Sequence, residues 1–323
     1  MTDRAALRRA AELIRQGRLV AFPTETVYGL GANALDEAAV RRIYEVKGRP
    51  PQSPLIVHVS SLEMARRLAA EWPEAAERLA RRFWPGPLTL VLPKCPQIPD
   101  LVTAGLPSVG LRMPSHPLAL ELIREAGVPV AAPSANRFSR LSPTTAQHVR
   151  EGLGDAVDFI LDGGPTTVGI ESTVLSLVHV PPRVLRPGMV TRAEIEAVIG
   201  RVESGRRVED SHTPHLSPGL HARHYSPVTP LLLLLPGEPL PPGRGAYLWL
   251  TAPAPAAHSV GMPQEATAYA AVLYDVLHQE DAKGWDWIAV ERPPGGPEWE
   301  AIHDRLERAA QPERRRLNPP PRS

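Results

Sequence analysis

The chain has 323 residues, a formal net charge of +1 and a single cysteine. This length is enough for two domains with well-filled cores, whereas one cysteine excludes both an intramolecular disulfide and a zinc site built from several cysteines. The near-neutral charge argues against a strong electrostatic nucleic-acid footprint over the whole chain, which leaves room only for a local basic patch. Scarce cysteine fits a reducing compartment, so we expect a cytoplasmic protein.

The N-terminal segment predicts an amphipathic helix. Leu7, Ala10 and Ile14 fall on one face at helical spacing with arginines opposite, and the segment lacks the continuous apolar core of a secretory signal. The longest leucine run, residues 231–235, is far shorter than the roughly 20 apolar residues that span a bilayer. We therefore expect no membrane segment, and we expect the leucine run to form a buried strand.

The segment FPTETVYGLGANA at residues 22–34 follows a strand predicted over residues 19–22. Pro23 lacks the amide hydrogen that a central strand needs, so the chain leaves the sheet at this point. Thr24, Thr26 and Tyr28 then supply hydroxyl groups that can both donate and accept hydrogen bonds. Gly29 and Gly31 allow the backbone to approach a ligand closely. The segment is typical of a ligand-binding loop, although threonines and glycines also form ordinary strand ends.

Two cations lie between a helix predicted over residues 36–46 and a strand predicted over residues 55–59. Lysine is rare in this chain, so its use at Lys47 is informative. A lysine offers a compact charge and Arg49 offers a planar fork, a combination that suits a polyphosphate. The alternative is that both residues only complement the dipole at the end of the helix.

Polar residues also follow other predicted strands. Arg112 ends one strand, Glu171 and Ser172 open another after a glycine-rich turn, and the remaining residues of this kind are Ser134, Asn136, Ser142 and Arg186. Strand ends in open α/β sheets gather along one edge, where small ligands bind. The sequence therefore predicts a small-molecule site at that edge, although a serine or asparagine in a loop can also be a turn residue or a helix cap.

The second half of the chain predicts a smaller domain. Thr191 and Glu194 form a capping box for a helix that ends the first domain, residues 1–200. Residues 201–227 are polar without a period and predict a linker. Strands near residues 231–235, 246–250 and 287–290 then alternate with helices near residues 264–278 and 297–310, which predicts a parallel α/β domain over residues 228–312. No GxGxxG motif follows its first strand, so we expect no dinucleotide, and we expect residues 313–323 to be a disordered tail.

A series of motifs runs in order from about residue 17 to residue 200, namely FPTETVYGLGANA, KGRP with SPLIVHV, WPGPLTLVL, VGLRMPSHP, APSAN with SPT, DGG, ESTV and LRPG. Together they resemble the YrdC-like catalytic domain of threonylcarbamoyl-AMP synthases. The later motif IHDRLERAA is similar to the closing helix of the two-domain form of this family. The resemblance implies an α/β fold with a YrdC-like twisted open mixed sheet and flanking helices, followed by a smaller Rossmann-like parallel α/β domain.

The resemblance also implies a nucleotidyltransferase. Its substrates are L-threonine, bicarbonate or CO2, and ATP, and its products are L-threonylcarbamoyladenylate and pyrophosphate. The product serves threonylcarbamoyl modification of the adenosine next to the anticodon in tRNA, through a downstream threonylcarbamoyl-transferase machinery. The carbamate of threonine attacks the α-phosphorus of ATP while pyrophosphate leaves, a reaction that depends on positioning and on electrostatic stabilisation by cations, hydroxyls and backbone amides.

The family's site residues carry over motif by motif. The resemblance implies that L-threonine lies against Thr26, His58, Arg112, Ala132 and Ser172. It implies that ATP lies against Lys47, Arg49, Ser53, Ser108, Ser134, Asn136, Ser142, Arg186 and Tyr225. The linker would act as a lid in which Tyr225, or else His224, touches the nucleotide. For His58, a half-buried structural histidine is the alternative.

Magnesium is implied by the nucleotide rather than by a protein motif, since Mg²⁺ is usually held by few carboxylates together with substrate phosphates. Glu25 and Glu171 are the candidate ligands, and no zinc is expected. Two other functions stay open. One is an RNA-binding module with a weak tRNA contact through a local basic patch. The other is a carbamoyl transferase, although the larger enzymes of that kind add zinc-binding and acylphosphatase modules that this chain lacks.

Overall fold

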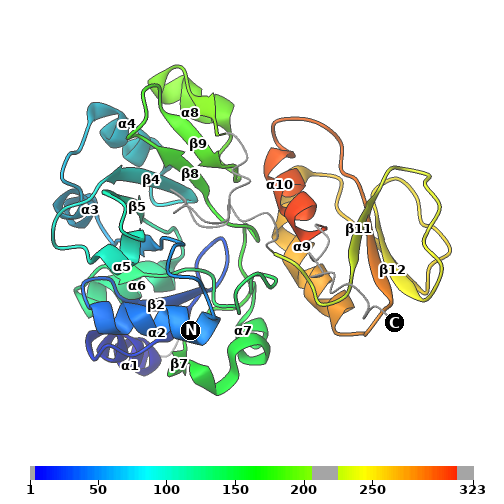
Figure 1. The fold of residues 1–323 in the computed structure, drawn as a ribbon, viewed down its shortest axis with the longest axis horizontal. Coiled ribbons are helices and arrows are strands. Elements are labelled where there is room, and N and C mark those ends of the chain that lie inside the picture. Colours follow the sequence, from blue (N-terminus) through cyan, green and yellow to red (C-terminus); the bar gives the residue numbers. More distant parts are fainter. Residues whose placement is uncertain (1–3, 206–224, 311–323) are drawn as a thin grey trace, which may run out of the picture.

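The computed structural model describes residues 4–205 and 225–310 of the chain, which form a large α/β part and a smaller α/β part (Figure 1). The large part contains a 10-stranded sheet of order β10-β9-β8-β4-β5-β3-β6-β2-β1-β7. The sheet is mixed, because β1 pairs with β2 antiparallel whereas β4 pairs with β8 parallel. The expected twisted mixed sheet is therefore confirmed.

The strands of this sheet are short. Their bounds are β1 (Val20–Phe22), β2 (Gly29–Asn33), β3 (Ile56–His58), β4 (Leu88–Pro93), β5 (Ser108–Arg112), β6 (Val130–Ala131), β7 (Phe159–Ile160), β8 (Thr173–Ser176), β9 (Arg183–Arg186) and β10 (Glu203–Ser204). As expected, β1 ends immediately before Pro23. The last strand, β10, lies inside the expected linker and pairs with β9 in parallel.

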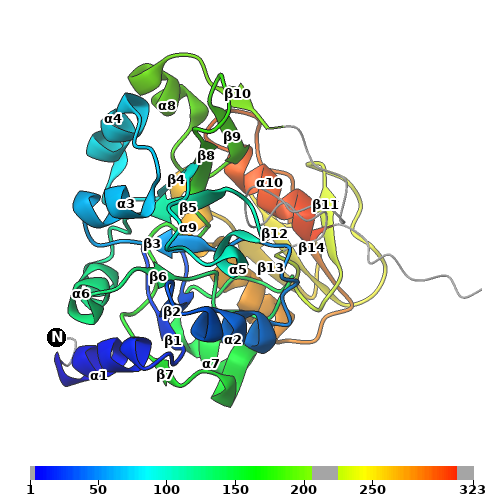
Figure 2. The ribbon, with the colours of Figure 1, turned by 60° about the vertical axis from the view of Figure 1, so that its left-hand side comes forward.

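Helices cover the sheet. Their bounds are α1 (Arg4–Arg15), α2 (Glu37–Lys47), α3 (Leu62–Leu68), α4 (Glu74–Phe83), α5 (Asp100–Thr103), α6 (Pro117–Ala126), α7 (Ala146–Leu153) and α8 (Arg192–Ile199), with a short 3₁₀ turn at Gly154–Ala156. Figures 1 and 2 show α1, α3 and α4 on the side of the sheet away from the smaller part. The apolar face of α1 is buried as expected, and the capping box of Thr191 and Glu194 is present at the start of α8.

The smaller part is a parallel sheet of order β11-β14-β12-β13 with two long helices. Its elements are β11 (Leu231–Leu234), β12 (Gly245–Trp249), β13 (His258–Gly261), α9 (Ala266–Asp281), β14 (Trp287–Glu291) and α10 (Glu300–Ala309). The expectation of a buried leucine strand is wrong, because β11 is an edge strand and Leu235 just beyond it is 54% exposed. β13 is not among the strands expected from the sequence.

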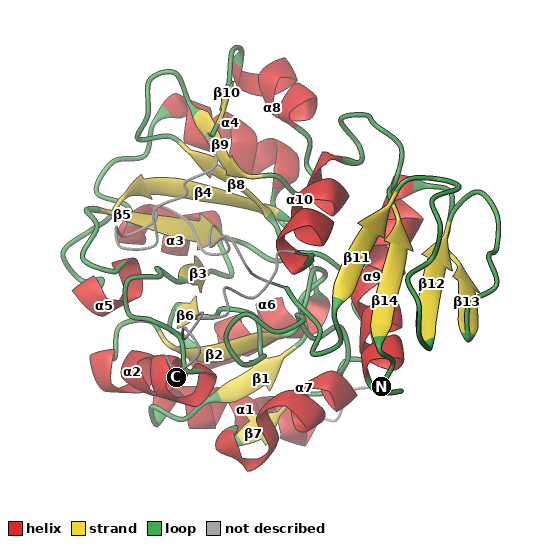
Figure 3. Cartoon of the chain, turned by 45° about the vertical axis from the view of Figure 1, so that its right-hand side comes forward, coloured by secondary structure: helices red, strands yellow, loops and turns green. Residues whose placement is uncertain are grey.

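The two parts are packed against each other. Val27, Leu141 and Ile170 of the large part belong to one apolar cluster with side chains of α9 and α10. Figures 1 and 3 show α10 at the junction, between the two sheets. Within the described ranges 4–205 and 225–310, no helix has the length and apolar character needed to cross a bilayer.

One glycine marks how closely the two parts approach. Gly169 has a φ of +80°, and a Cβ atom placed on it would lie 2.2 Å from the backbone oxygen of Ala270 in α9. Such a collision can be relieved only by displacing backbone. Only a residue without a side chain fits at this point of the junction.

We expect Gly169→Ala to destabilise the protein more than Gly164→Ala does. Gly164 has a φ of +79°, and a Cβ atom added there would meet no other atom within 4 Å, so its substitution adds only backbone strain of about 1–2 kcal/mol. Gly169→Ala adds the collision with α9 to the same strain. Urea unfolding of both variants measures the difference, and equal losses of stability would show that the junction is loose.

Candidate active site

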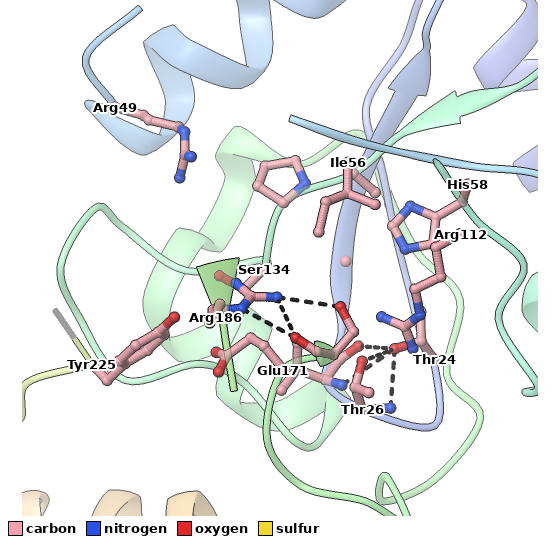
Figure 4. Close-up of a pocket in the computed structure, with 15 residues that line it drawn as sticks. Thr24, Thr26, Arg49, Ile56, His58, Arg112, Ser134, Glu171, Arg186 and Tyr225 are labelled. Carbon is pink, nitrogen blue, oxygen red and sulfur yellow. Dashed lines mark hydrogen bonds between the residues drawn. The ribbon is translucent and has the colours of Figure 1, made fainter. Parts of the chain in front are cut away.

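A pocket lies where several strands of the large sheet end (Figure 4). Its walls come from the loop after β1, from the segment after α2, from β3, from the ends of β5 and β9, from the loop after β6, from the residues before β8, and from the segment that precedes β11. The lining residues are Thr24, Thr26, Val27, Gly29, Arg49, Ile56, His58, Arg112, Ala132, Pro133, Ser134, Glu171, Ser172, Arg186 and Tyr225. The gathering of polar strand ends that the sequence predicts is therefore present.

The predicted site residues divide into those that line this pocket and those that lie behind it. All residues expected to hold L-threonine line it, namely Thr26, His58, Arg112, Ala132 and Ser172. Of those expected to hold ATP, the structure brings Arg49, Ser134, Arg186 and Tyr225 to the pocket. His224 lies outside the described residues, as does the expected tail at residues 313–323.

Three of the other residues expected to hold ATP support the walls from behind. Lys47 is the last residue of α2, and its ammonium donates hydrogen bonds to the carbonyl oxygens of Ser134, at 2.6 Å, and Asn136. The carbonyl of Ser53 accepts a hydrogen bond from Arg49, and the hydroxyl of Ser142 donates one to Glu171 over 2.5 Å.

Two further residues expected to hold ATP are also absent from the lining of the pocket. The Asn136 side chain donates to the carbonyls of Arg137 and Arg140, which closes the loop on itself. Ser108 is buried at the start of β5, opposite Pro93 of β4.

Two buried guanidinium groups define one half of the pocket. Figure 4 shows Arg49 and Arg186 on its left side, together with Ser134, Glu171 and Tyr225. Arg186 donates from Nε and Nη2 to the carbonyl oxygen of Ser172, at 3.1 and 2.9 Å. Burial, reinforced by the nearby charge of Arg186, lowers the pKa of Arg49 to about 10. Both groups are charged near neutral pH, so this half attracts anions.

Burial also lowers the pKa of Lys47 well below its usual value, with Arg49 acting in the same direction. Three basic groups, Lys47, Arg49 and Arg186, are thus enclosed in one region, and an anion placed among them would relieve their mutual repulsion.

The other half of the pocket contains Arg112 and His58. Arg112 forms an ion pair with Glu25, with 2.8 Å between Nη2 and Oε1, and both side chains are buried. Burial, reinforced by the charge of Arg112, lowers the pKa of His58 to about 3, so the imidazole is neutral. Its Nδ1 atom has no hydrogen-bond partner among the described residues. This half offers a guanidinium for a carboxylate and a neutral ring nitrogen for a hydroxyl group.

The loop after β1 holds itself in shape. The hydroxyl of Thr24 donates to the carbonyl of Val27 over 2.6 Å and accepts from the amides of Thr26 and Val27 at 3.2 Å. The Thr24 and Thr26 hydroxyl oxygens lie 2.8 Å apart. This wall of the pocket therefore has internal hydrogen bonds that do not depend on a ligand.

Glu171 is the one carboxylate among the lining residues that the structure describes, and the smaller part of the chain holds it. Its carboxylate accepts hydrogen bonds from Ser142, from Arg305 of α10 at 2.8 Å, and from Tyr274 of α9 at 3.2 Å. Burial raises the pKa of Glu171, but the charges of Arg305 and Arg186 outweigh that effect and the net shift is downward. Glu171 is thus ionised.

Both carboxylates named as candidate magnesium ligands already have protein partners. Glu171 is saturated by hydrogen-bond donors, and Glu25 is paired with Arg112. Across residues 4–205 and 225–310, no group of three or more His, Cys, Asp or Glu side chains is arranged to hold a metal ion.

Sequence reasoning missed that α9 and α10 hold Glu171, because Tyr274 lies in no recognised motif and the motif IHDRLERAA, which contains Arg305, implied only a closing helix. It also missed the lining by Val27, Ile56 and Pro133. Apolar residues of this kind are indistinguishable in sequence from ordinary core residues.

Comparisons with known proteins cover both parts of the chain. A family profile described as "Telomere recombination" matches residues 12–188, and one described as "Threonylcarbamoyl-AMP synthase, C-terminal domain" matches residues 190–311. The chain is 43% identical to the threonylcarbamoyl-AMP synthase of Bacillus subtilis, over 96% of this chain and 94% of that protein. It is 52% identical to that of Pyrococcus abyssi over 71% of this chain and 67% of that protein.

The fold agrees with a solved structure. The crystal structure of P. abyssi Sua5 complexed with L-threonine superposes with a TM-score of 0.88 at 41% identity, and the match covers 94% of each chain. The sequence is therefore similar to that of both relatives, and the arrangement of the two parts is shared with the P. abyssi protein. The chain belongs to the threonylcarbamoyl-AMP synthase family in its two-domain form, a family of nucleotidyltransferase-type enzymes.

Proposed function

We propose that this enzyme converts L-threonine, bicarbonate or CO2, and ATP into L-threonylcarbamoyladenylate and pyrophosphate. The observation that carries the proposal is the division of one pocket into an anion-binding half around Arg49 and Arg186 and an amino-acid-binding half around Arg112 and His58. The existence of a complex of the P. abyssi relative with L-threonine supports an amino acid as one of the substrates. A pocket that serves both substrates places their reacting groups side by side.

In this proposal Arg112 pairs with the carboxylate of L-threonine, and Glu25 sets the orientation of Arg112 from behind. The neutral His58 ring forms a hydrogen bond with the side-chain hydroxyl of L-threonine. The amine of threonine adds to CO2 and loses a proton, which gives a carbamate. A carbamate oxygen then forms a bond to the α-phosphorus of ATP, while the bond to the pyrophosphate oxygen breaks and that oxygen takes the electron pair.

Arg49 and Arg186 stabilise the negative charge that develops on the phosphate oxygens during this step. Lys47 contributes indirectly, because its hydrogen bonds fix the loop that carries Ser134 and Asn136. Ser53, Asn136 and Ser142 contribute in the same indirect way, through hydrogen bonds within the walls of the pocket, and Ser108 is assigned no role. Magnesium would arrive with the ATP phosphates, whose charge it neutralises, and we assign it no ligand from this chain.

The product is a mixed anhydride that water destroys, so a transferase must take it up and deliver the threonylcarbamoyl group to the adenosine next to the anticodon of tRNA. Direct tRNA contact by this enzyme is not required by that scheme. A cytoplasmic location belongs to the same proposal, because ATP and tRNA meet there.

The test is to incubate the pure protein with ATP, L-threonine and bicarbonate and to measure pyrophosphate. Release that requires threonine supports the proposal, whereas release that requires carbamoyl phosphate instead would favour a carbamoyl transferase. Salt-dependent tRNA binding without threonine-dependent pyrophosphate would favour an RNA-binding module.

We expect Arg112→Ala to lower kcat/KM for L-threonine by at least about 30-fold, because loss of one partner of a buried charge pair costs at least about 2 kcal/mol. The KM for ATP should change little, since Arg112 lies in the other half of the pocket. Arg183→Gln is the matched control, because it removes a partly exposed ion pair with Glu203 in the same sheet. A similar loss in both variants would contradict the assignment.

The buried neutral His58 predicts a dependence of stability on pH. Its pKa is about 3 in the folded protein and 6.5 in the unfolded chain, so the unfolded chain binds the extra proton as pH falls below 6.5. The free energy of unfolding therefore decreases as the pH falls. Between pH 7 and pH 5 the wild type should lose about 2 kcal/mol more than His58→Gln does.

Urea unfolding at the two pH values measures this difference. His278, whose pKa is lowered to about 4 mainly by burial, acts in the same direction in both proteins and cancels in the comparison. Equal losses in the two proteins would mean that His58 is charged and solvated.

A further inference from the structure

A buried arginine of the smaller part reaches the wall of the pocket. Arg305 of α10 is only 1% exposed. Its Nε donates to the Glu171 carboxylate at 2.8 Å, its Nη2 donates to the Glu171 carbonyl oxygen at 3.3 Å, and its Nη1 lies 2.8 Å from Asp304. One guanidinium group therefore fixes both the side chain and the backbone of a lining residue.

The same guanidinium also supports Tyr225. Its central carbon lies 5.2 Å from the centre of the Tyr225 ring, within the range of a cation–π contact. Tyr225 has a φ of +61°, a conformation that a residue with a bulky side chain holds only when its surroundings enforce it. The ring of Tyr274, whose hydroxyl donates to Glu171, is centred 6.0 Å from the centre of the Tyr225 ring.

Both residues that Arg305 holds face the anion-binding half of the pocket. Figure 4 shows Glu171 and Tyr225 on the side of Arg186 and Arg49, away from His58 and Arg112. Glu171 is also the negative charge among the buried cations, since its field raises the pKa of Lys47 and of Arg186 against the effect of burial. A shift of Glu171 would therefore change both the shape and the charge balance where the ATP phosphates are placed.

We propose that Arg305 is a positioning residue for the nucleotide half of the active site, so that the second domain completes the ATP site through Glu171 and Tyr225. The inference rests on the proposed position of ATP. Arg305 touches no substrate itself. Its loss should weaken ATP binding selectively, whereas an arginine that only joins the two domains would affect both substrates alike through stability.

The experiment uses the full-length chain and measures the KM of each substrate by pyrophosphate release, together with ATP affinity by calorimetric titration. Arg305→Gln should weaken ATP binding by about 10- to 100-fold, the range expected for a lost hydrogen bond to a charged group, and should change the KM for L-threonine by less than about threefold. Arg305→Lys keeps a charge but cannot reach the carboxylate and the carbonyl together, so it should restore only part of the affinity.

Tyr274→Phe provides a milder variant that removes one hydrogen bond to Glu171 and keeps the ring in the apolar cluster. It should weaken ATP binding in the same selective way, and it decides the question if Arg305→Gln fails to fold. The matched control is Asp275→Asn in the same helix, which removes the contact of 3.5 Å with His148 across the same junction but touches no lining residue. It should leave ATP affinity unchanged.

Unchanged ATP affinity in Arg305→Gln or in Tyr274→Phe would overturn the inference. Equal weakening for both substrates, accompanied by lower thermal stability, would do the same and would make Arg305 a structural link. Failure of the proposed function has a different signature, namely a wild type that binds ATP but releases no pyrophosphate in response to threonine.

Discussion

Enclosed positive charge is the constraint on which the rest of this structure depends. Lys47, Arg49 and Arg186 are all buried near the same strand ends, and no chain keeps such groups away from water without compensation. Backbone carbonyls of the surrounding loops accept their hydrogen bonds, and the negative charge of Glu171 raises the pKa of Lys47 and of Arg186. The hydrogen bonds from the cations hold the loops in place. The same bonds compensate the cations for the water that they lose on burial.

This arrangement explains why the second domain packs where it does. Glu171 alone would balance the cations poorly if its carboxylate could rotate, and the side chains that fix it come from α9 and α10. The junction also excludes water through the apolar cluster of Ile170 and its neighbours, so the ion pair with Arg305 operates in a region of low dielectric constant. Catalytic electrostatics and domain packing are thus parts of one network.

Much of the large domain could be predicted because its signals are local. Pro23 ends a strand by its missing amide hydrogen, and Thr191 with Glu194 starts a helix by a capping box, whatever the rest of the chain does. The gathering of polar loops at one edge followed from the rule for strand ends in α/β sheets. The leucine strand β11 was misjudged because burial depends on whether a strand lies at the edge of its sheet, and the sequence of the strand itself does not contain that information.

The contacts of Arg305 and of Glu25 were beyond sequence reasoning for the same reason. In the motif IHDRLERAA a charged residue at helical spacing is typical of a solvated face, and only the approach of two distant segments turns Arg305 into a buried partner of Glu171.

The hydrogen bonds of Thr24 have a consequence for ligand binding. Because its hydroxyl already satisfies the amides of Thr26 and Val27, this wall of the pocket is held in place before any substrate arrives, and the entropic penalty of ordering it does not have to be met when a ligand binds.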